Sequence, residues 1–158
     1  MNDRTIKSWF EQALPAQTIH NFQVQLGCHF EEVAEMLIEL RVVGTAQHVS
    51  GHAVQEAIRA VSKLADQLKQ GEVIVVPLSR KLLLDSICDQ NVTGTGVAHM
   101  LGMDIEGALN EVNQSNWSKF VDGKPIFDDN GKIKKGPDYK EPDLMPFVNQ
   151  NAAFNPST

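Results

Sequence analysis

The sequence predicts an all-α protein, a helical bundle of about five helices followed by a hairpin-like extension. Along two long stretches, apolar residues recur at alternating spacings of three and four, which is the period of one helix face. Serine or aspartate precedes two further stretches, as expected for residues that cap the start of a helix. The 158 residues can bury the core of one domain. We therefore expect residues 1–148 to form a single domain and residues 149–158 to form a flexible tail.

Three helices are expected in the first half of the chain. Residues 3–14 form a short amphipathic segment that Pro15 stops, because proline cannot continue a helix. A second helix is predicted over about 21–43. Its apolar face consists of Leu26, Phe30, Val33, Leu37 and Leu40. A third helix over about 49–70 shows the same period and is closed by Gly71.

Two more helices are expected after an extended connection. The connection is the sequence EVIVVP at 72–77, which is rich in β-branched residues but isolated from any other strand-like segment. Ser79 can cap a helix that runs to about residue 101, and Asp104 can cap the next, over about 105–120. A Gly-Thr-Gly run at 94–96 lies inside the first of these helices, and we interpret it as a position of close packing.

The character of the chain changes at Val121. Asp-Gly and Asn-Gly pairs are turn signals, and the segments KPIF (124–127) and KIKK (132–135) are possible arms of a hairpin. We therefore expect residues 121–148 to form a hairpin-like extension of the helical domain.

Charge and hydropathy exclude two classes of partner. A net charge of −6 without a basic stripe argues against general nucleic-acid binding. No apolar stretch approaches the ~18 residues of a membrane span, and the N-terminus lacks a signal-peptide pattern. We therefore expect a cytoplasmic protein. One local cluster of lysines would attract anionic ligands: Lys119, Lys124, Lys132, Lys134, Lys135 and Lys140.

Two acidic clusters interrupt apolar helical segments. Glu31, Glu32 and Glu35 lie within the second predicted helix, and Asp85 and Asp89 lie four residues apart within the fourth. Carboxylates at the edge of a core are costly unless a cation joins them. If the two helix faces meet, they predict a divalent-metal site, and metal ions on carboxylates often serve phosphate chemistry. The alternative is that each cluster is an ordinary solvated helix face.

The fifth helix adds polar groups to an apolar stripe. Continuing its helical angle brings Asn116 and Lys119 onto the stripe that Ile105 begins. An amide and an ammonium group aimed inward need an anion or an acceptor, unless the helix end frays and both groups reach water. With metal on one side and Lys119 on the other, the charges suit a polyphosphate.

These residues, in this order, resemble the MazG-like all-α nucleoside triphosphate pyrophosphohydrolases, relatives of phosphoribosyl-ATP pyrophosphohydrolase and dimeric dUTPase. That family carries an EExxE helix, then an acidic pair ending in Asp, then an Asn and a Lys on a later helix. The matching segments here are EEVAE at 31–35, DSICD at 85–89 and NQSNWSK at 113–119. The resemblance covers about residues 20–144, and residues 104–144 are similar to phage and bacterial members throughout.

By that resemblance, carboxylates of the first two motifs bind Mg²⁺, for which Mn²⁺ can substitute. The metal ligands implied are Glu32, Glu35, Asp85 and Asp89. The family's second motif is usually ExxD, but Ser86 stands three residues before Asp89, so Asp85 supplies the fourth carboxylate. Glu31 or Glu35 would orient the attacking water, and Glu31 is also a possible ligand.

The substrate side of the site is expected on the fifth helix and the extension. Its candidate residues are Asn113, Asn116, Trp117, Lys119, Lys135 and Tyr139. Asn116 and Lys119 would contact phosphates, and Lys135 would help to neutralise the leaving pyrophosphate. The base would lie in a pocket formed by the 20–30 segment with Trp117 or Tyr139.

The resemblance thus implies Mg²⁺-dependent hydrolysis of a nucleoside triphosphate, by preference a purine deoxynucleotide, to the monophosphate and pyrophosphate. It also implies a homodimer or homotetramer. Two alternatives stay open: a phosphoribosyl-ATP pyrophosphohydrolase, against which the long basic extension argues, or a non-catalytic helical module with an oligomerising or regulatory role.

Overall fold

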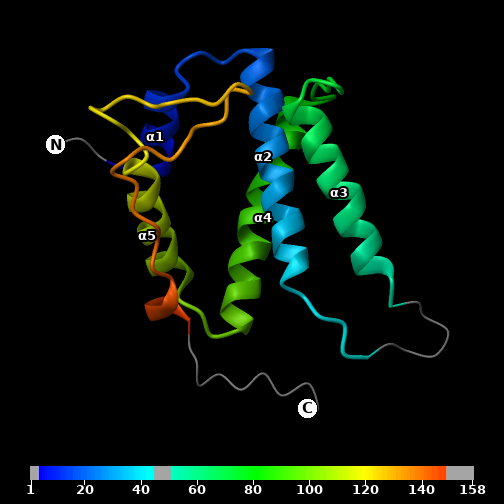
Figure 1. The fold of residues 1–158 in the computed structure, drawn as a ribbon. Helices are drawn as coiled ribbons and strands as arrows, with labels where there is room; N and C mark the ends of the chain where they lie inside the picture. The colour runs from blue at the N-terminus through cyan, green and yellow to red at the C-terminus, as the bar shows by residue number, and fades with distance from the viewer. Residues whose placement is uncertain (1–3, 45–50, 149–158) are drawn as a thin grey trace. The chain divides into compact units, whose positions relative to one another are not determined.

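A computed structural model describes residues 4–44 and 51–148 (Figure 1). The described residues contain these helices: α1 (Ile6–Ala13), α2 (Ile19–Ile38), α3 (Ala53–Lys69), α4 (Arg80–Met100), α5 (Ile105–Trp117) and the short 3₁₀ helix η1 (Met145–Phe147). They contain no β-strand, so the predicted all-α class is confirmed. In this part of the chain, no helix has both the length and the apolar character to cross a membrane.

The chain divides into two compact units, and each is described by itself. The α2–α3 unit comprises residues 14–75 and 127–132, and the α1–α4–α5 unit comprises the described residues of 1–13, 76–126 and 133–158. The prediction that residues 1–148 form a single domain stays a prediction. The predicted tail and the first residues of two predicted helices (3, 49 and 50) lie outside the described part of the chain.

Four of the described helices begin at side-chain caps. The predicted caps are confirmed: the Ser79 hydroxyl accepts a hydrogen bond from the Leu82 amide at 3.3 Å, and the Asp104 carboxylate accepts one from the Gly107 amide at 3.0 Å. Thr18, which the pattern did not single out, caps α2 by accepting from the Asn21 amide at 3.1 Å.

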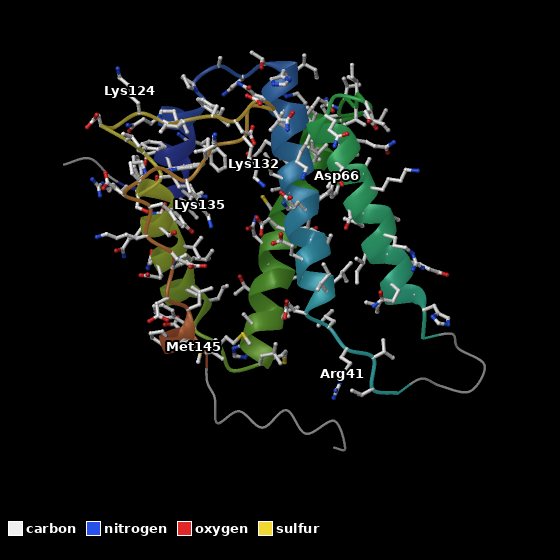
Figure 2. All side chains as sticks on the ribbon, viewed as in Figure 1. Arg41, Asp66, Lys124, Lys132, Lys135 and Met145 are labelled. Carbon is white, nitrogen blue, oxygen red and sulfur yellow. The ribbon has the colours of Figure 1, made fainter. Side chains whose placement is uncertain are left out.

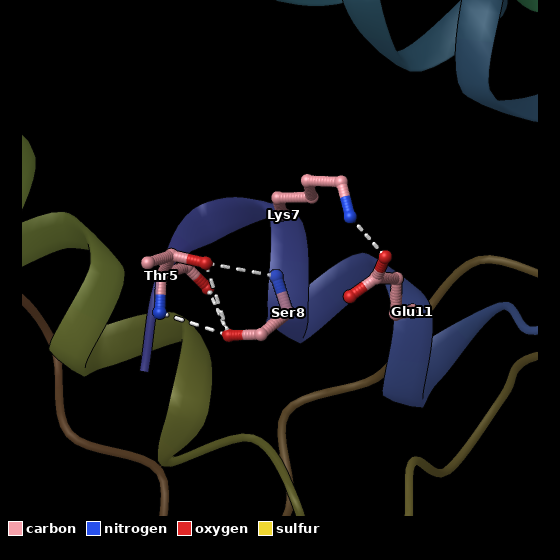
Figure 3. A network of polar contacts seen from close by, with 4 residues as sticks. All are labelled: Thr5, Lys7, Ser8 and Glu11. Atoms are coloured by element: carbon pink, nitrogen blue, oxygen red, sulfur yellow. Dashed lines mark hydrogen bonds and ion pairs between the residues drawn. The ribbon is translucent and has the colours of Figure 1, made fainter. Parts of the chain in front are cut away.

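The helix α1 begins with a reciprocal cap, drawn in Figure 3. The Thr5 amide donates to the Ser8 hydroxyl at 2.8 Å, and the Ser8 amide donates to the Thr5 hydroxyl at 3.0 Å. Two amides that have no partner inside the helix are thereby satisfied, as in a capping box. One turn along, Lys7 and Glu11 form an exposed ion pair, which contributes little to stability.

The predicted end of α2 is wrong by five residues. The helix ends at Ile38, not at residue 43, and residues 39–44 are exposed. Most of a helix's stability comes from packing one face, and no part of the described chain buries residues 39–44. The β-branched pair Val42 and Val43 also disfavours continuation of the helix. The helix α5 is likewise shorter than predicted and ends at Trp117.

The core of the α2–α3 unit lies between two antiparallel helices, which Figure 1 shows side by side. Its buried apolar side chains are Val24, Ala34, Ala65 and Leu68. Residues 72–75 follow α3 without helix or strand, and the amides of Glu72 and Val73 turn back to the Gln67 carbonyl, so the predicted extended connection does not begin at residue 72. The buried Gln23 side chain holds this segment at Val75. The Gln23 amide group donates to the Val75 carbonyl at 2.6 Å and accepts from the Val75 amide at 3.2 Å.

Close packing occurs at Gly27, not in the Gly-Thr-Gly run where it was predicted. A Cβ at Gly27 would lie 2.8 Å from the Ala65 carbonyl oxygen, whereas a Cβ at Gly94 or Gly96 would meet no atom within 4 Å. Gly27 faces the partner helix, while Gly94 is exposed. The interpretation of residues 94–96 as a packing site is therefore wrong.

The α1–α4–α5 unit is organised around Trp9. This side chain is 7% exposed and stacks on Phe120 with ring centroids 5.9 Å apart. Its indole N–H donates to the Asn116 carbonyl at 2.9 Å, which ties α1 to the end of α5. The helix α4 buries Ala98 beside the turn into α5, where the Ala98 carbonyl accepts from the Met103 amide at 3.0 Å.

The extension contains the predicted turns but no strands within its described residues. Asp122 and Gly123 both have positive φ (49° and 72°), as the Asp-Gly turn requires. Backbone hydrogen bonds join Lys134 to Ile126 at 2.7 Å and Asp128 to Lys132 at 2.9 Å, in the register of a hairpin. So short a ladder does not form a sheet.

Candidate functional site

The glutamates of the EEVAE motif lie on α2 in different environments. Glu32 and Glu35 are exposed, and no described residue forms a hydrogen bond or an ion pair with either carboxylate. Together with Glu39 they line an open hollow of about 440 Å³ beside Met36 and Ile38. Their oxygens are therefore accessible to a ligand, and carboxylate oxygens are the ligands that Mg²⁺ prefers.

Glu31 is paired with two lysines of the same unit. Its Oε1 lies 2.9 Å from the Lys69 ammonium and its Oε2 lies 2.7 Å from the Lys132 ammonium. Lys69 is also 3.2 Å from Asp66 on α3. Figure 2 shows Lys132 beside α2 and Asp66 on α3. Both oxygens of Glu31 therefore already carry a cationic partner.

These contacts shift the pKa values of the three groups. Burial by itself raises the pKa of Glu31, but hydrogen bonds from Lys132 and Lys69 outweigh it and hold the pKa below the ordinary value. The hydrogen bond to Glu31 raises the pKa of Lys132 against the opposing effect of burial. For Lys69, burial lowers the pKa, but hydrogen bonds to Glu31 and Asp66 outweigh this effect and hold the pKa above the ordinary value. All three groups are held charged.

The pairing of Glu31 should make stability depend on pH. Because folding lowers its pKa, its contribution is present above the ordinary glutamate pKa of 4.5 and is lost as the pH falls through the lowered value. The lysine contributions are present below 10.5 and are lost at more alkaline pH. We expect Glu31→Gln to reduce the free energy of unfolding by about 1 kcal/mol at neutral pH and to match wild type in strong acid.

Urea unfolding of both proteins at neutral and acid pH measures this difference. Glu11→Gln, which removes an exposed pair on α1, is the control and should change stability much less at either pH. A deficit in Glu31→Gln that persists undiminished in strong acid would show that the charge of Glu31 contributes nothing.

The acidic pair of the second motif lies in the α1–α4–α5 unit. Asp85 and Asp89 are exposed on α4, one helical turn apart. The other predicted carboxylates, Glu32 and Glu35, belong to the α2–α3 unit. Within residues 4–44 and 51–148, no three His, Cys, Asp or Glu side chains form a group that could hold a metal ion.

The predicted substrate-binding residues Asn113, Asn116 and Lys119 lie on α5 or just after it, beside α1 and the residue that precedes α1. The Asn113 side-chain amide donates to the Arg4 carbonyl at 2.6 Å, and the Asn116 carbonyl accepts from Trp9. Lys119 is half-buried, as its place on the apolar stripe predicts, with its ammonium 6.0 Å from the centre of the Trp9 ring. The Asn113 side chain is thus used in holding the fold, whereas Asn116 takes part through its backbone carbonyl.

Trp117 lines a second hollow, of about 290 Å³. The Arg4 guanidinium lies 5.6 Å from the centre of the Trp117 ring, and Lys140 lies on the same wall. Among the described residues, no hydrogen-bond partner reaches the buried indole N–H of Trp117 or the buried side-chain oxygen Oδ1 of Asn113, one turn earlier. In the extension, the Lys135 ammonium lies 4.5 Å from the centre of the Tyr139 ring.

Sequence reasoning missed Lys69 as a neighbour of the acidic motif, and it treated Lys132 only as one member of a lysine cluster. Lys69 is 38 residues from Glu31, and Lys132 is 101 residues away. The sequence offered only one sign of these contacts, which is that a lysine carries the charge opposite to that of Glu31. Charge alone does not specify which carboxylate it will meet.

We found no family model, curated protein or solved structure that matches this chain. The likeness to MazG-like pyrophosphohydrolases therefore rests on the motifs at 31–35, 85–89 and 113–119.

Proposed function

We propose that this protein hydrolyses a nucleoside triphosphate, by preference a purine deoxynucleotide, to the monophosphate and pyrophosphate with Mg²⁺ as cofactor. One observation carries the proposal. Glu32 and Glu35 offer carboxylates without described partners to a hollow on α2, while Lys69 and Lys132 bring two ammonium groups to the same helix at Glu31. Carboxylates for a metal ion beside cations for phosphate are the charges that a metal-bound triphosphate requires.

Each residue has a distinct role in this proposal. Glu32 and Glu35 hold the metal ion. A bound Mg²⁺ supplies positive charge to the phosphates and lowers the pKa of a water molecule. Glu35 is the better candidate to orient that water, since Glu31 already accepts hydrogen bonds from two ammonium groups.

Product analysis tests the reaction. Purified protein is incubated with Mg²⁺ and each common ribo- and deoxynucleoside triphosphate, and pyrophosphate and orthophosphate are measured separately. Pyrophosphate with the matching monophosphate is expected, and chelation of the metal should abolish both. Orthophosphate as the sole product, or no turnover of any nucleotide, rejects the proposal. Phosphoribosyl-ATP is included as a substrate, because preference for it would support the alternative enzyme.

Lys119→Ala tests the predicted phosphate role of Lys119, which lies just after α5. If Lys119 contacts a phosphate, its loss should raise KM about tenfold while the fold is retained. Lys124→Ala is the matched control, since Lys124 is an exposed lysine of the same lysine cluster (Figure 2). Steady-state kinetics with the best substrate measures both. Equal, small effects of the two variants would mean that Lys119 contributes only general positive charge.

A further inference from the structure

The hollow beside Trp117 lies wholly within the α1–α4–α5 unit and has a volume of about 290 Å³. We propose that this Trp117 hollow binds a small metabolite through a phosphate or carboxylate group, which Arg4 and Lys140 recognise. The site goes beyond the proposed hydrolysis, because neither a metal ion nor a residue of the EEVAE motif takes part in it.

Two cations line the Trp117 hollow without an anionic partner. Arg4 and Lys140 are both exposed, and no described residue forms an ion pair with either side chain. Among the described lining residues, Glu111 supplies the one carboxylate, and one of its oxygens accepts a hydrogen bond from the Asp143 amide at 3.3 Å. Positive charge is therefore in excess, and it favours an anionic ligand.

Side chains of α5 and its C-cap fix the backbone of both cationic residues. The Asn113 amide group donates to the Arg4 carbonyl at 2.6 Å. The Ser115 hydroxyl, on a residue only 6% exposed, donates to the Lys140 carbonyl at 2.7 Å, and the Lys140 amide donates to the Ser118 hydroxyl at 2.8 Å. Buried and half-buried polar groups thus hold two unpaired cations at one hollow, which pre-organises the site for an anion.

Trp117 supports the guanidinium group of Arg4. The centre of this group lies 5.6 Å from the centre of the Trp117 ring, a cation–π contact that uses no N–H donor. The guanidinium fork stays available for two parallel hydrogen bonds to a carboxylate or a phosphate. No described residue satisfies the indole N–H of Trp117, so a further donor at this wall lacks an acceptor.

The size of the hollow favours a small metabolite over a bare ion. Ligand pockets usually measure about 300–1,000 Å³, and one water molecule occupies about 30 Å³ of liquid. The Trp117 hollow is near the lower limit of that range and has room for several atoms besides the anionic group. Glu111 and Gln114, which also line it, offer hydrogen bonds to a hydroxyl or amino group on the rest of the ligand.

An NMR titration of the metal-free protein tests the inference through its indole N–H resonances. The chain has two tryptophans, and Trp9, whose indole donates to the Asn116 carbonyl, is the internal reference. The probes are glycerol 3-phosphate, glycerate and neutral glycerol at constant ionic strength. We expect at least one charged probe, but not glycerol, to shift the Trp117 resonance and leave that of Trp9 in place. The tighter charged probe identifies the preferred group.

Charge variants measure the contribution of each cation. Arg4→Gln and Lys140→Gln should each weaken binding of the better probe about tenfold. Both residues contact α5 through their backbone, so these substitutions keep the hydrogen bonds that build the site. Arg80→Gln and Lys124→Gln are the matched controls, since these exposed cations of the same unit do not line the hollow, and binding should stay within about twofold of wild type. Arg4→Lys should recover only part of the affinity, because lysine lacks the fork.

Three results would overturn the inference. They are no shift of the Trp117 resonance with either charged probe, an equal shift with glycerol, and equal weakening by the control variants. Deoxyadenosine, a neutral nucleoside, is titrated as well, because the motif resemblance implies a base pocket at Trp117. A response to deoxyadenosine and to neither charged probe would assign the hollow to a base instead. Nucleotide hydrolysis is assayed separately, so failure of this site leaves the hydrolase proposal standing.

Discussion

Glu35→Gln is expected to lower the rate of pyrophosphate release by at least about 100-fold at saturating Mg²⁺ and nucleotide. Glutamine keeps the size of the side chain but removes its negative charge, so it neither binds a dication well nor orients a water as a base. Glu35 is exposed, and no described residue pairs with it, so the substitution leaves the packing of α2 unchanged. Rates of pyrophosphate formation in wild type and variant measure the effect.

Glu56→Gln is the matched control for this prediction. Glu56 is an exposed glutamate of α3 whose carboxylate pairs with no described residue. Its substitution also removes one negative charge from the α2–α3 unit, and activity should stay within about twofold of wild type, as for an ordinary surface change. Thermal melting of both variants should match wild type. Undiminished turnover in Glu35→Gln would reject the assigned mechanism.

Gly27→Ala is expected to lower the free energy of unfolding by about 1–2 kcal/mol, although alanine favours helices more than glycine does. The added Cβ would lie 2.7 Å from the Lys69 side chain and 2.8 Å from the Ala65 carbonyl oxygen. The side chain can move aside, but the carbonyl belongs to the backbone of α3, so the two helices must separate. Urea unfolding of both proteins measures the change.

Gly94→Ala is the internal control, and it should change the free energy of unfolding in the opposite direction. Gly94 lies inside α4, and a Cβ there meets no atom within 4 Å. Alanine should therefore stabilise the protein by about 0.5–1 kcal/mol through helix propensity alone. Destabilisation by both substitutions would show that α4 is packed at Gly94, and stabilisation by both would show that α2 and α3 tolerate a methyl group between them.

The helix α2, which Gly27→Ala perturbs, also positions Glu31 and its two lysine partners. Lys69 is the side chain that the new methyl group would strike, and the same lysine is paired with Glu31. The close approach of α2 to α3 therefore brings this lysine within reach of the acidic motif. A loss of packing at Gly27 should weaken that ion pair as well.

Local chemistry made parts of the fold predictable. Ser79 and Asp104 cap helices because their side chains accept hydrogen bonds from amides only three residues away, and so the sequence alone reveals them. The end of α2 was not predictable from its apolar period. That period continues past Ile38, but no partner covers the later residues.

The sequence by itself determined the helical class, the caps at the starts of α4 and α5, and the placement of Glu32 and Glu35 on one face of α2, because the helical period fixes which side chains share a face. Only the tertiary structure decided that Gly27 meets α3 and that Glu31 is paired with Lys69 and Lys132. Those contacts join residues 38 and 101 positions apart. Their partners are chosen by how the helices and the turn pack, which no local pattern of residues encodes.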